Sequence, residues 1–246
     1  MKDDQGNTLL HEAAISGNSQ IVRILMGRGL YLETENINGT TPMDSAVFHG
    51  NLEIIKEFIH NYEVSRRYQL LDNAITAKEE HIAEFLALIT PKYDSVDSFG
   101  NTSMHDAVQK GQLETVKVLL KRGAKPNAQN QFLLSPLHMA VGEYAKVTKN
   151  VENTTKSIGM NAGRYAEIVK LISFSCNNHD CQDFNGNTAL HIAAQEGLIE
   201  IVETLMPFYG NLFIENKMGE TPLALAYGKD DGVGDLLMKE VDKRCQ

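Results

Sequence analysis

Apolar residues along the chain fall into short groups with the spacing of amphipathic helices. Clear examples lie at 21–25, 54–59, 116–120 and 201–205, where hydrophobic side chains recur within one helical turn. This spacing places them on one face of a helix. Ahead of such a group there is a shorter segment with small alanines and a closing glycine, as in Ala13-Ala14 followed by Gly17. The pattern therefore predicts pairs of short helices in an all-α fold.

The helix pairs recur with a fixed period. The aligned positions near the start of each pair are His11, Asp44, Asp72, His105, His138, His191 and Ala224. Successive positions are 33, 28, 33, 33, 53 and 33 residues apart. Such a period indicates a tandem array, in which each repeat buries its helices against its neighbours. We expect a single domain over 1–246 with repeats at about 3–35, 36–60, 61–93, 97–129, 130–182, 183–215 and 216–246.

The start of six repeats carries a common motif. It reads TLLHEA, TPMDSA, TSMHDA, SPLHMA, TALHIA and TPLALA. These segments resemble the T-P-L-H-x-A signature of ankyrin repeats. The resemblance implies an α-solenoid of stacked helix-turn-helix units with short β-hairpin loops along one edge. It also implies that the aligned histidines tie hairpin to helix and are not catalytic. Asp44 and Asp72 can accept but not donate at this position, which predicts weaker repeats there.

Two repeats depart from the pattern. The third lacks the turn and the motif, and Lys78 stands where other repeats have glycine, so we expect it to lose its hairpin, either by drift or as a hinge. The fifth carries a 20-residue insertion near 142–163. Its apolar residues recur every three or four positions and suit an extension of the first helix, with Gly159 and Gly163 marking the return: Tyr144, Val147, Val151, Thr155 and Ile158. The insertion is either a tolerated loop or part of a binding face.

Charge and composition narrow the function classes. The net charge of −9 argues against a nucleic-acid surface. The three cysteines are too sparse for a disulfide scaffold, and the N-terminus has no apolar leader. Cys176, His179 and Cys181 resemble half of a metal site, but a structural zinc needs four ligands. We expect a monomeric cytoplasmic protein with no cofactor, no nucleic acid and no membrane insertion, or one acting in a host cytosol if it is a secreted bacterial effector.

The remaining candidate site is a surface. In ankyrin repeats, partners usually meet the hairpin tips and the exposed side of the first helices. The matching candidates here are Ile37, Phe48, His49, Phe99, Gln109, Lys110, Phe132, Leu134, Phe184, Gln195, Glu196 and Met218. Apolar side chains at four consecutive tips either form a recognition strip or seal the groove between hairpins. We expect a non-enzymatic scaffold that binds a partner protein or peptide; the alternative is a targeting segment of a larger enzyme or effector.

Overall fold

The protein is built from helices joined by turns. The computed structural model describes residues 2–90, 96–149, 155–209, 211–229 and 231–244, with the backbone alone for 155–160. Among these residues there is no strand, only isolated β-bridges that join Lys2 to Thr8 and Val96 to Thr102. The predicted all-α class is confirmed. The chain divides into two compact units, here the N-terminal unit (Met1–Lys92) and the C-terminal unit (Tyr93–Gln246).

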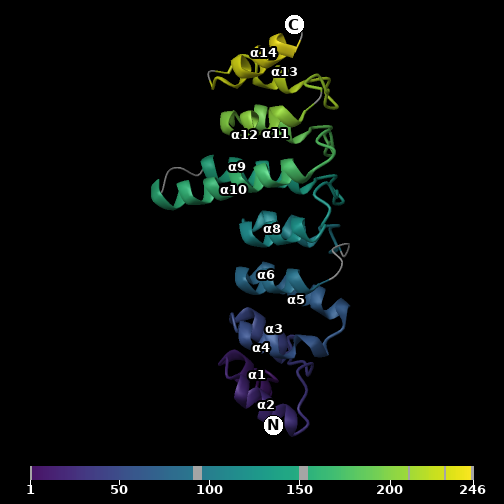
Figure 1. The fold of residues 1–246 in the computed structure, drawn as a ribbon, viewed down its shortest axis with the longest axis vertical. Coiled ribbons are helices and arrows are strands. Elements are labelled where there is room, and N and C mark those ends of the chain that lie inside the picture. Colours follow the sequence, from purple (N-terminus) through teal and green to yellow (C-terminus); the bar gives the residue numbers. More distant parts are fainter. Residues whose placement is uncertain (1, 91–95, 150–154, 210, 230, 245–246) are drawn as a thin grey trace. The chain divides into compact units, whose positions relative to one another are not determined.

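The N-terminal unit is a stack of three helix pairs (Figure 1). Its helices are α1 (Leu9–Ile15), α2 (Ser19–Gly27), α3 (Pro42–Phe48), α4 (Leu52–Phe58), the short 3-10 helix η1 (Ile59–Asn61), α5 (Val64–Ala77) and α6 (Glu80–Ile89). The first helices α1, α3 and α5 contact one another in order, and so do the second helices α2, α4 and α6. The core between the two layers holds fully buried side chains such as Leu10, Met43 and Leu71.

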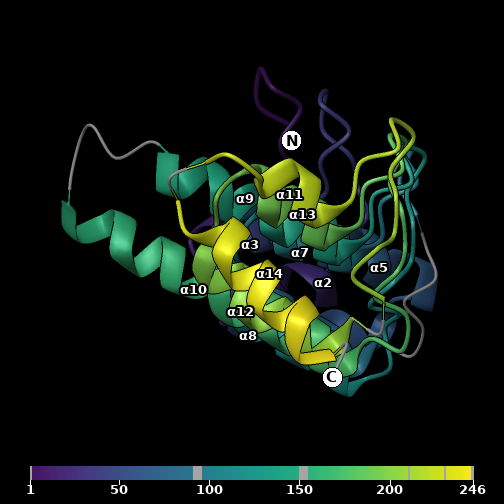
Figure 2. The same ribbon diagram turned by 90° about the horizontal axis from the view of Figure 1, so that it is seen from above.

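The C-terminal unit repeats this arrangement with four pairs. Its helices are α7 (Ser103–Gln109), α8 (Leu113–Lys121), α9 (Pro136–Lys149), α10 (Thr155–Ser175), α11 (Ala189–Gln195), α12 (Ile199–Leu205), the 3-10 helix η2 (Met206–Phe208), α13 (Pro222–Ala226) and α14 (Val233–Arg244). Contacts run from α7 through α9 and α11 to α13, and from α8 through α10 and α12 to α14. Figure 2 shows these as two layers, with the hairpin loops gathered on one side.

The first helices α1, α3, α5, α7 and α11 end where the backbone turns left-handed. The glycines at these ends are Gly17, Gly50, Gly111 and Gly197, with φ between 67° and 72°. Glycine suits this conformation because it has no Cβ to clash. In the third repeat, Lys78 takes the same conformation with φ 62°. The alignment of Lys78 with the glycines is therefore confirmed.

The aligned histidines hold neighbouring repeats together. In His11, His105, His138 and His191, Nδ1 accepts a hydrogen bond from the backbone N–H of the helix-capping Thr or Ser, at 3.0–3.2 Å. Each Nε2 lies 2.9–3.1 Å from a backbone carbonyl at the base of the next hairpin. Because Nδ1 accepts, Nε2 carries the proton and donates. The predicted structural role of these histidines is confirmed.

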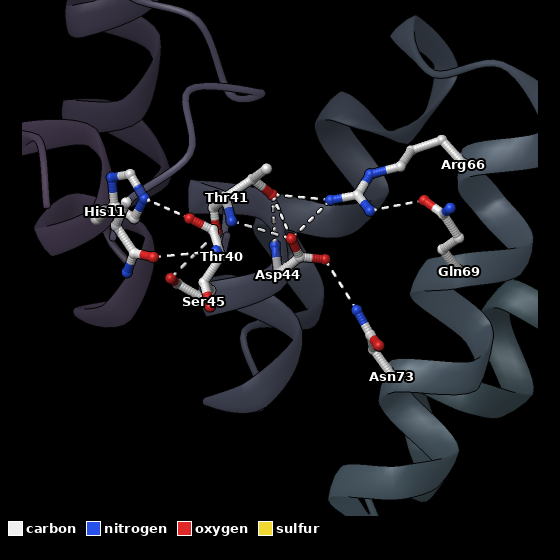
Figure 3. A network of polar contacts seen from close by, with 9 residues as sticks. His11, Thr40, Thr41, Asp44, Ser45, Arg66, Gln69 and Asn73 are labelled. Carbon is white, nitrogen blue, oxygen red and sulfur yellow. Dashed lines mark hydrogen bonds and ion pairs between the residues drawn. The ribbon is translucent and has the colours of Figure 1, made fainter. Parts of the chain in front are cut away.

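The third repeat has lost its hairpin, as predicted, and a different contact replaces the histidine tie. Only Tyr62 and Glu63 separate η1 from α5, so no hairpin carbonyl faces Asp44. Instead, Arg66 Nη2 of α5 donates to Asp44 Oδ2 at 2.6 Å, and Asn73 Nδ2 donates to Asp44 Oδ1 at 2.9 Å (Figure 3). Asp44 is therefore well paired, contrary to the weaker tie expected of it.

Asp72 does not play the part of an aligned capping residue. The helix α5 begins at Val64, eight residues before Asp72, so Asp72 lies inside the helix and not in its first turn. The other first helices of this unit, α1 and α3, begin two residues before their aligned residue. The third repeat thus keeps the position of its helix end at Lys78 while extending its helix start into the space of the lost hairpin.

The insertion in the fifth repeat lengthens both helices of its pair. Helix α9 is 14 residues long and α10 is 21, and Figure 1 shows both reaching beyond α11 and α12. The predicted extension of the first helix is confirmed as far as Lys149, and Val151 lies outside the described residues. Thr155 and Ile158 belong to α10 instead. Gly159 and Gly163 were expected to mark the return, but both lie within α10, where packing along α9 outweighs the low helix propensity of glycine.

Candidate functional site

Four hairpins of the C-terminal unit present their tips through the same turn. An Asp or Asn side chain accepts hydrogen bonds from the backbone N–H groups two and four residues further on, at 2.8–3.0 Å. The four residues are Asp97, Asn130, Asp183 and Asn216. Such Asx turns fix the backbone of the tip without help from the side chains between them. The tip side chains are consequently available for other contacts.

The tips carry large apolar side chains that face water. The exposed fraction is 55% for Phe99, 55% for Phe132, 65% for Phe184 and 82% for Met218. We call these four residues the tip row. Backbone hydrogen bonds help to join neighbouring tips: Gln131 N donates to the Phe99 carbonyl and Lys217 N donates to the Asn185 carbonyl, both at 3.0 Å. More than half of each tip-row side chain is therefore left uncovered.

Phe184 differs from the other members of the tip row by one position in the turn. Phe99, Phe132 and Met218 stand two residues after the Asx residue, whereas Phe184 stands one residue after Asp183. The equivalent position in the next hairpin is Lys217, and its Nζ lies 4.3 Å from the centre of the Phe184 ring. This cation–π contact holds the ring at one side of the sixth hairpin. The offset itself is visible in the sequence, but the contact with Lys217 was not predicted.

A hollow of about 300 Å³ lies beside the last two members of the tip row. It is lined by Phe184, Asn185 and Asn187 of the sixth hairpin, by Asn216, Lys217, Met218 and Glu220 of the seventh, and by Gln195 of α11 and Leu225 of α13. The lining combines apolar side chains with carboxamides, and its two charges, Lys217 and Glu220, have opposite signs. Such a hollow suits an uncharged side chain whose flanking backbone bonds to amides.

The predicted residues at the ends of the first helices are less uniform. Gln109 and Gln195 are exposed, while Lys110 and Glu196 are half-buried. Leu134 lies instead at the base of the hairpin before α9 and is half-buried; its carbonyl accepts from His105 Nε2 at 3.0 Å. Several already have partners: the Gln109 carbonyl accepts from the Tyr165 hydroxyl at 3.1 Å, the Gln195 carbonyl from Lys229 Nζ at 2.5 Å, and Glu196 pairs with Lys149. Of these residues, Gln195 is the one that reaches the hollow.

Three predicted residues belong to the N-terminal unit. Ile37 is 71% exposed at the tip of the second hairpin, and Phe48 is 43% exposed at the end of α3. His49 caps that helix, with Nδ1 2.8 Å from the Ser45 carbonyl oxygen. Ile37 thus lies at a hairpin tip of this unit, and Phe48 and His49 lie at the end of α3.

Leu133, next to the tip row, has a backbone conformation that the sequence analysis did not predict. Its φ is 56°, at the position where the other three hairpins of this unit have Gly100, Gly186 and Gly219. A leucine is rarely found in this left-handed region, because its Cβ crowds the backbone. The side chain is 43% exposed, next to Phe132. The missing glycine in the motif "NQFLL" was the available signal.

The segment with Cys176, His179 and Cys181 is engaged in local contacts. His179 Nε2 lies 2.8 Å from the Ser173 carbonyl oxygen, and the imidazole stacks on Phe208 at 5.1 Å. Cys176 Sγ donates to the Asn178 carbonyl at 3.0 Å, and burial raises the pKa of this thiol. Within the described part of the chain, no three His, Cys, Asp or Glu side chains are grouped as metal ligands would be. In the same residues, no helix is both long and apolar enough to cross a membrane.

Comparison with known proteins finds one family. The sequence model for ankyrin repeats in three copies matches residues 1–68 and 158–246, and the single ankyrin repeat matches residues 99–131. Human transient receptor potential cation channel subfamily A member 1 is 29% identical over 197 residues, which are 74% of this chain and 16% of that protein. Human ankyrin repeat and SOCS box protein 3 is 27% identical over 203 residues, covering 76% and 34%.

Solved structures give the same result for the fold. The ankyrin repeat domain of Bcl-3, a member of the IkappaB protein family, has a TM-score of 0.75 and 24% identity, covering 96% of this chain and all of that one. The ankyrin repeat domain of human ASB11 has a TM-score of 0.67 and 21% identity, covering 95% and 97%. The chain spans about a sixth to a third of the length of the curated relatives named above.

Proposed function

The chain belongs to the ankyrin repeat family, and we propose that it binds a partner protein or peptide along the tip row and the first helices of its C-terminal unit. Ankyrin repeats are in general protein–protein interaction modules, and the fold is typically non-catalytic. The observation that carries the proposal is the run of four apolar tip side chains, each more than half exposed, beside a hollow of about 300 Å³. Exposed apolar side chains in a line commonly mark a recognition surface.

The geometry favours an extended segment with apolar side chains. Successive hairpins each offer one apolar contact, and the carboxamides of Asn185, Asn187 and Asn216 line the hollow where the bound backbone would pass. The turns are already fixed by their Asx hydrogen bonds, so binding costs little ordering of the protein. The side chain that enters the hollow would be uncharged, since Lys217 and Glu220 balance each other.

The test compares a variant that loses two rings of the tip row with a control that loses one exposed ring elsewhere. Peptides are first selected from a displayed library by the wild-type protein, and their affinity is then measured for Phe99→Ala with Phe184→Ala and for Phe213→Ala. Phe213 is a matched control because it is 57% exposed and lies outside the hollow and the tip row. We expect the double variant to weaken binding by about 10- to 100-fold, as for contact residues worth 1–3 kcal/mol, while Phe213→Ala leaves it unchanged.

Stability measurements separate binding from folding. All four tip-row side chains are exposed, so the double variant should melt at nearly the wild-type temperature. If it unfolds, the rings seal the hairpins and the proposal is wrong. If binding survives in the double variant, or falls equally in Phe213→Ala, the partner surface lies elsewhere.

The alternative, that the array targets a longer enzyme or effector, concerns the whole protein. Its support is that the curated relatives carry their ankyrin repeats within much longer chains. An antibody against the C-terminal unit, used on an extract of the native source, would detect a species well above 27.3 kDa if this holds. A band at that mass would contradict it.

A further inference from the structure

A second groove lies on the opposite layer of the C-terminal unit, between α10 and α12. It has a volume of about 580 Å³ and is bounded by one face of each helix together with η2. The α10 residues follow helical spacing from Gly163 through Glu167 and Lys170 to Phe174. Figure 2 shows α10 and α12 in the layer of second helices, away from the hairpin loops. This surface, the outer groove, is thus separate from the tip row.

Small residues stand at the N-terminal end of the α10 face that lines the groove. Gly163 and Ala166 line it, and a Cβ added at Gly163 would meet no atom within 4 Å. The stretch from Gly163 to Phe174 spans eleven helical steps, or about 16 Å. That length matches about three turns of another helix. The groove between α10 and α12 therefore offers a seat for a short helix on the layer of second helices.

The closed end of the outer groove is aromatic. Phe174 is 69% exposed, and its ring meets Phe208 edge to face with 5.0 Å between centres. Phe208 in turn stacks on His179, which is held by the Ser173 carbonyl. A large apolar ring that is fixed at its base and open to water above provides an anchor point for an apolar side chain.

The rim of the outer groove is acidic. Glu167, Glu200 and Glu203 line it, against a single cation, Lys170. The Glu200 carboxylate is held in place by the Tyr144 hydroxyl, which donates to Oε2 at 2.7 Å. In a chain of net charge −9, this local excess of carboxylates attracts Lys and Arg and repels acidic partners.

We propose that the outer groove binds a short basic amphipathic helix of another protein, with an apolar side chain seated against Phe174 and Lys or Arg side chains paired with Glu167, Glu200 and Glu203. The apolar anchor supplies affinity and the acidic rim supplies selectivity for charge. This binding is independent of the tip row, so the two surfaces can hold two partners at once.

The probe is a fluorescein-labelled panel of three-turn amphipathic peptides. In each, Lys and Arg form one face and Leu, Ile, Phe or Tyr the other, and a mirror panel carries Glu in place of every Lys and Arg. Fluorescence anisotropy at physiological salt should show binding of at least one basic peptide and none of the acidic panel. Phe174→Ala and Glu203→Lys should each weaken it by about tenfold or more.

Matched controls separate the outer groove from general attraction to an acidic protein. Glu53→Lys makes the same charge change on an exposed residue of the N-terminal unit, and Phe213→Ala removes an exposed ring elsewhere. Both should leave affinity within about twofold, and so should Phe184→Ala in the tip row. Because Phe174 and Glu203 are exposed, their variants should retain the wild-type helical circular dichroism.

Three outcomes would overturn the proposal. One is that no basic peptide binds, or that both panels bind alike. Another is that Glu53→Lys weakens binding as much as Glu203→Lys, which would show diffuse electrostatics. The third is concentration-dependent sedimentation of the wild-type protein that Phe174→Ala abolishes, since a second copy of this chain would then occupy the groove.

Discussion

Replacing Asp44 by the histidine that four other repeats carry there should lower the free energy of unfolding, although changes toward a repeat consensus commonly raise it. The histidine tie needs a carbonyl of the next hairpin, and the third repeat has no hairpin to supply one. Arg66 faces position 44 instead, with its guanidinium 2.6 Å from Asp44 Oδ2. An imidazole at this position would donate toward a cation and leave that cation unpaired.

The size of the loss follows from the contacts that disappear. The imidazole Nδ1 can still accept from Thr41 N, as in the other repeats, so the helix cap survives. The hydrogen bonds from Arg66 and Asn73 are lost, and a bond to a charged group is worth about 1.5–3 kcal/mol. The Asp44 side chain is 6% exposed and that of Arg66 is 23% exposed, so water compensates only in part. We expect a loss of about 2–3 kcal/mol, below the 3–5 kcal/mol of a fully buried broken pair.

Urea unfolding followed by far-UV circular dichroism measures this loss, with hydrogen exchange of the α3 amides to localise it. The transition of the N-terminal unit should move down by about 1–2 M urea. Arg23→Ala is the comparison, because Arg23 pairs with Glu57 at the surface of the same unit and is 63% exposed. That exposed pair should contribute less than about 1 kcal/mol.

A second substitution tests the stated cause. If the unpaired guanidinium is what destabilises Asp44→His, then adding Arg66→Gln to that variant should recover part of the stability. The reasoning fails if Asp44→His is as stable as the wild type or more stable. It also fails if the added Arg66→Gln lowers stability further by the full amount that it costs in the wild type.

Three other predictions concern backbone strain and titration. Leu133→Gly should raise the free energy of unfolding by about 1 kcal/mol, because it removes a leucine from the left-handed region. Gly219→Leu, at the equivalent turn with open space around it, should lower the free energy of unfolding by a similar amount. Both changes are measured from urea midpoints. Lys78→Gly should likewise stabilise by about 1 kcal/mol, and unchanged midpoints for it and Leu133→Gly would show that these turns carry no strain. Burial lowers the pKa of His105, His138 and His191 below the ordinary 6.5. The unfolded chain therefore binds more protons at these residues, and the free energy of unfolding should fall as pH drops through about 6.5. A free energy of unfolding that stays constant from pH 7.5 to pH 5.5 would contradict this.

The sequence was sufficient for the regular part of the fold because its signals are local and repeated. A Thr or Ser start, a histidine three residues later and a glycine at φ near 70° each stabilise the same short helix, and they recur at one spacing. Position 78 shows the strength of this signal. The alignment placed a lysine where glycine belongs, and the backbone there is left-handed all the same.

The structure of the insertion was predicted less accurately, because the position of its second helix depends on packing between helices. Gly159 and Gly163 are turn signals in isolation, yet both lie within the 21-residue helix α10. A helix that packs against α9 along its length gains more than two glycines cost, at about 1 kcal/mol each. Single-residue propensities could not show this, because they take no account of the packing against α9.

The surface was predicted in outline only. The tip positions follow from the repeat, so the alignment found Phe99, Phe132 and Met218, which are exposed at one position of the turn. The contact of Phe184 with Lys217 and the hollow beside it depend on where two hairpins meet in space. Such features depend on the particular side chains of two neighbouring repeats. An alignment by period compares repeats one at a time and does not show them.

The role of a side chain in this array accordingly depends on the group that the neighbouring repeat places opposite it. His11 is useful because Thr40 offers a carbonyl, and Asp44 is useful because Arg66 offers a guanidinium. Without the third hairpin, a histidine at position 44 would have no carbonyl to bond to. Asp44 and Arg66 together form the contact that replaces the histidine tie. The same reasoning applies to the fifth repeat, where α9 and α10 lengthen together and each covers the other. An interruption that is matched by its neighbour in this way preserves the stack.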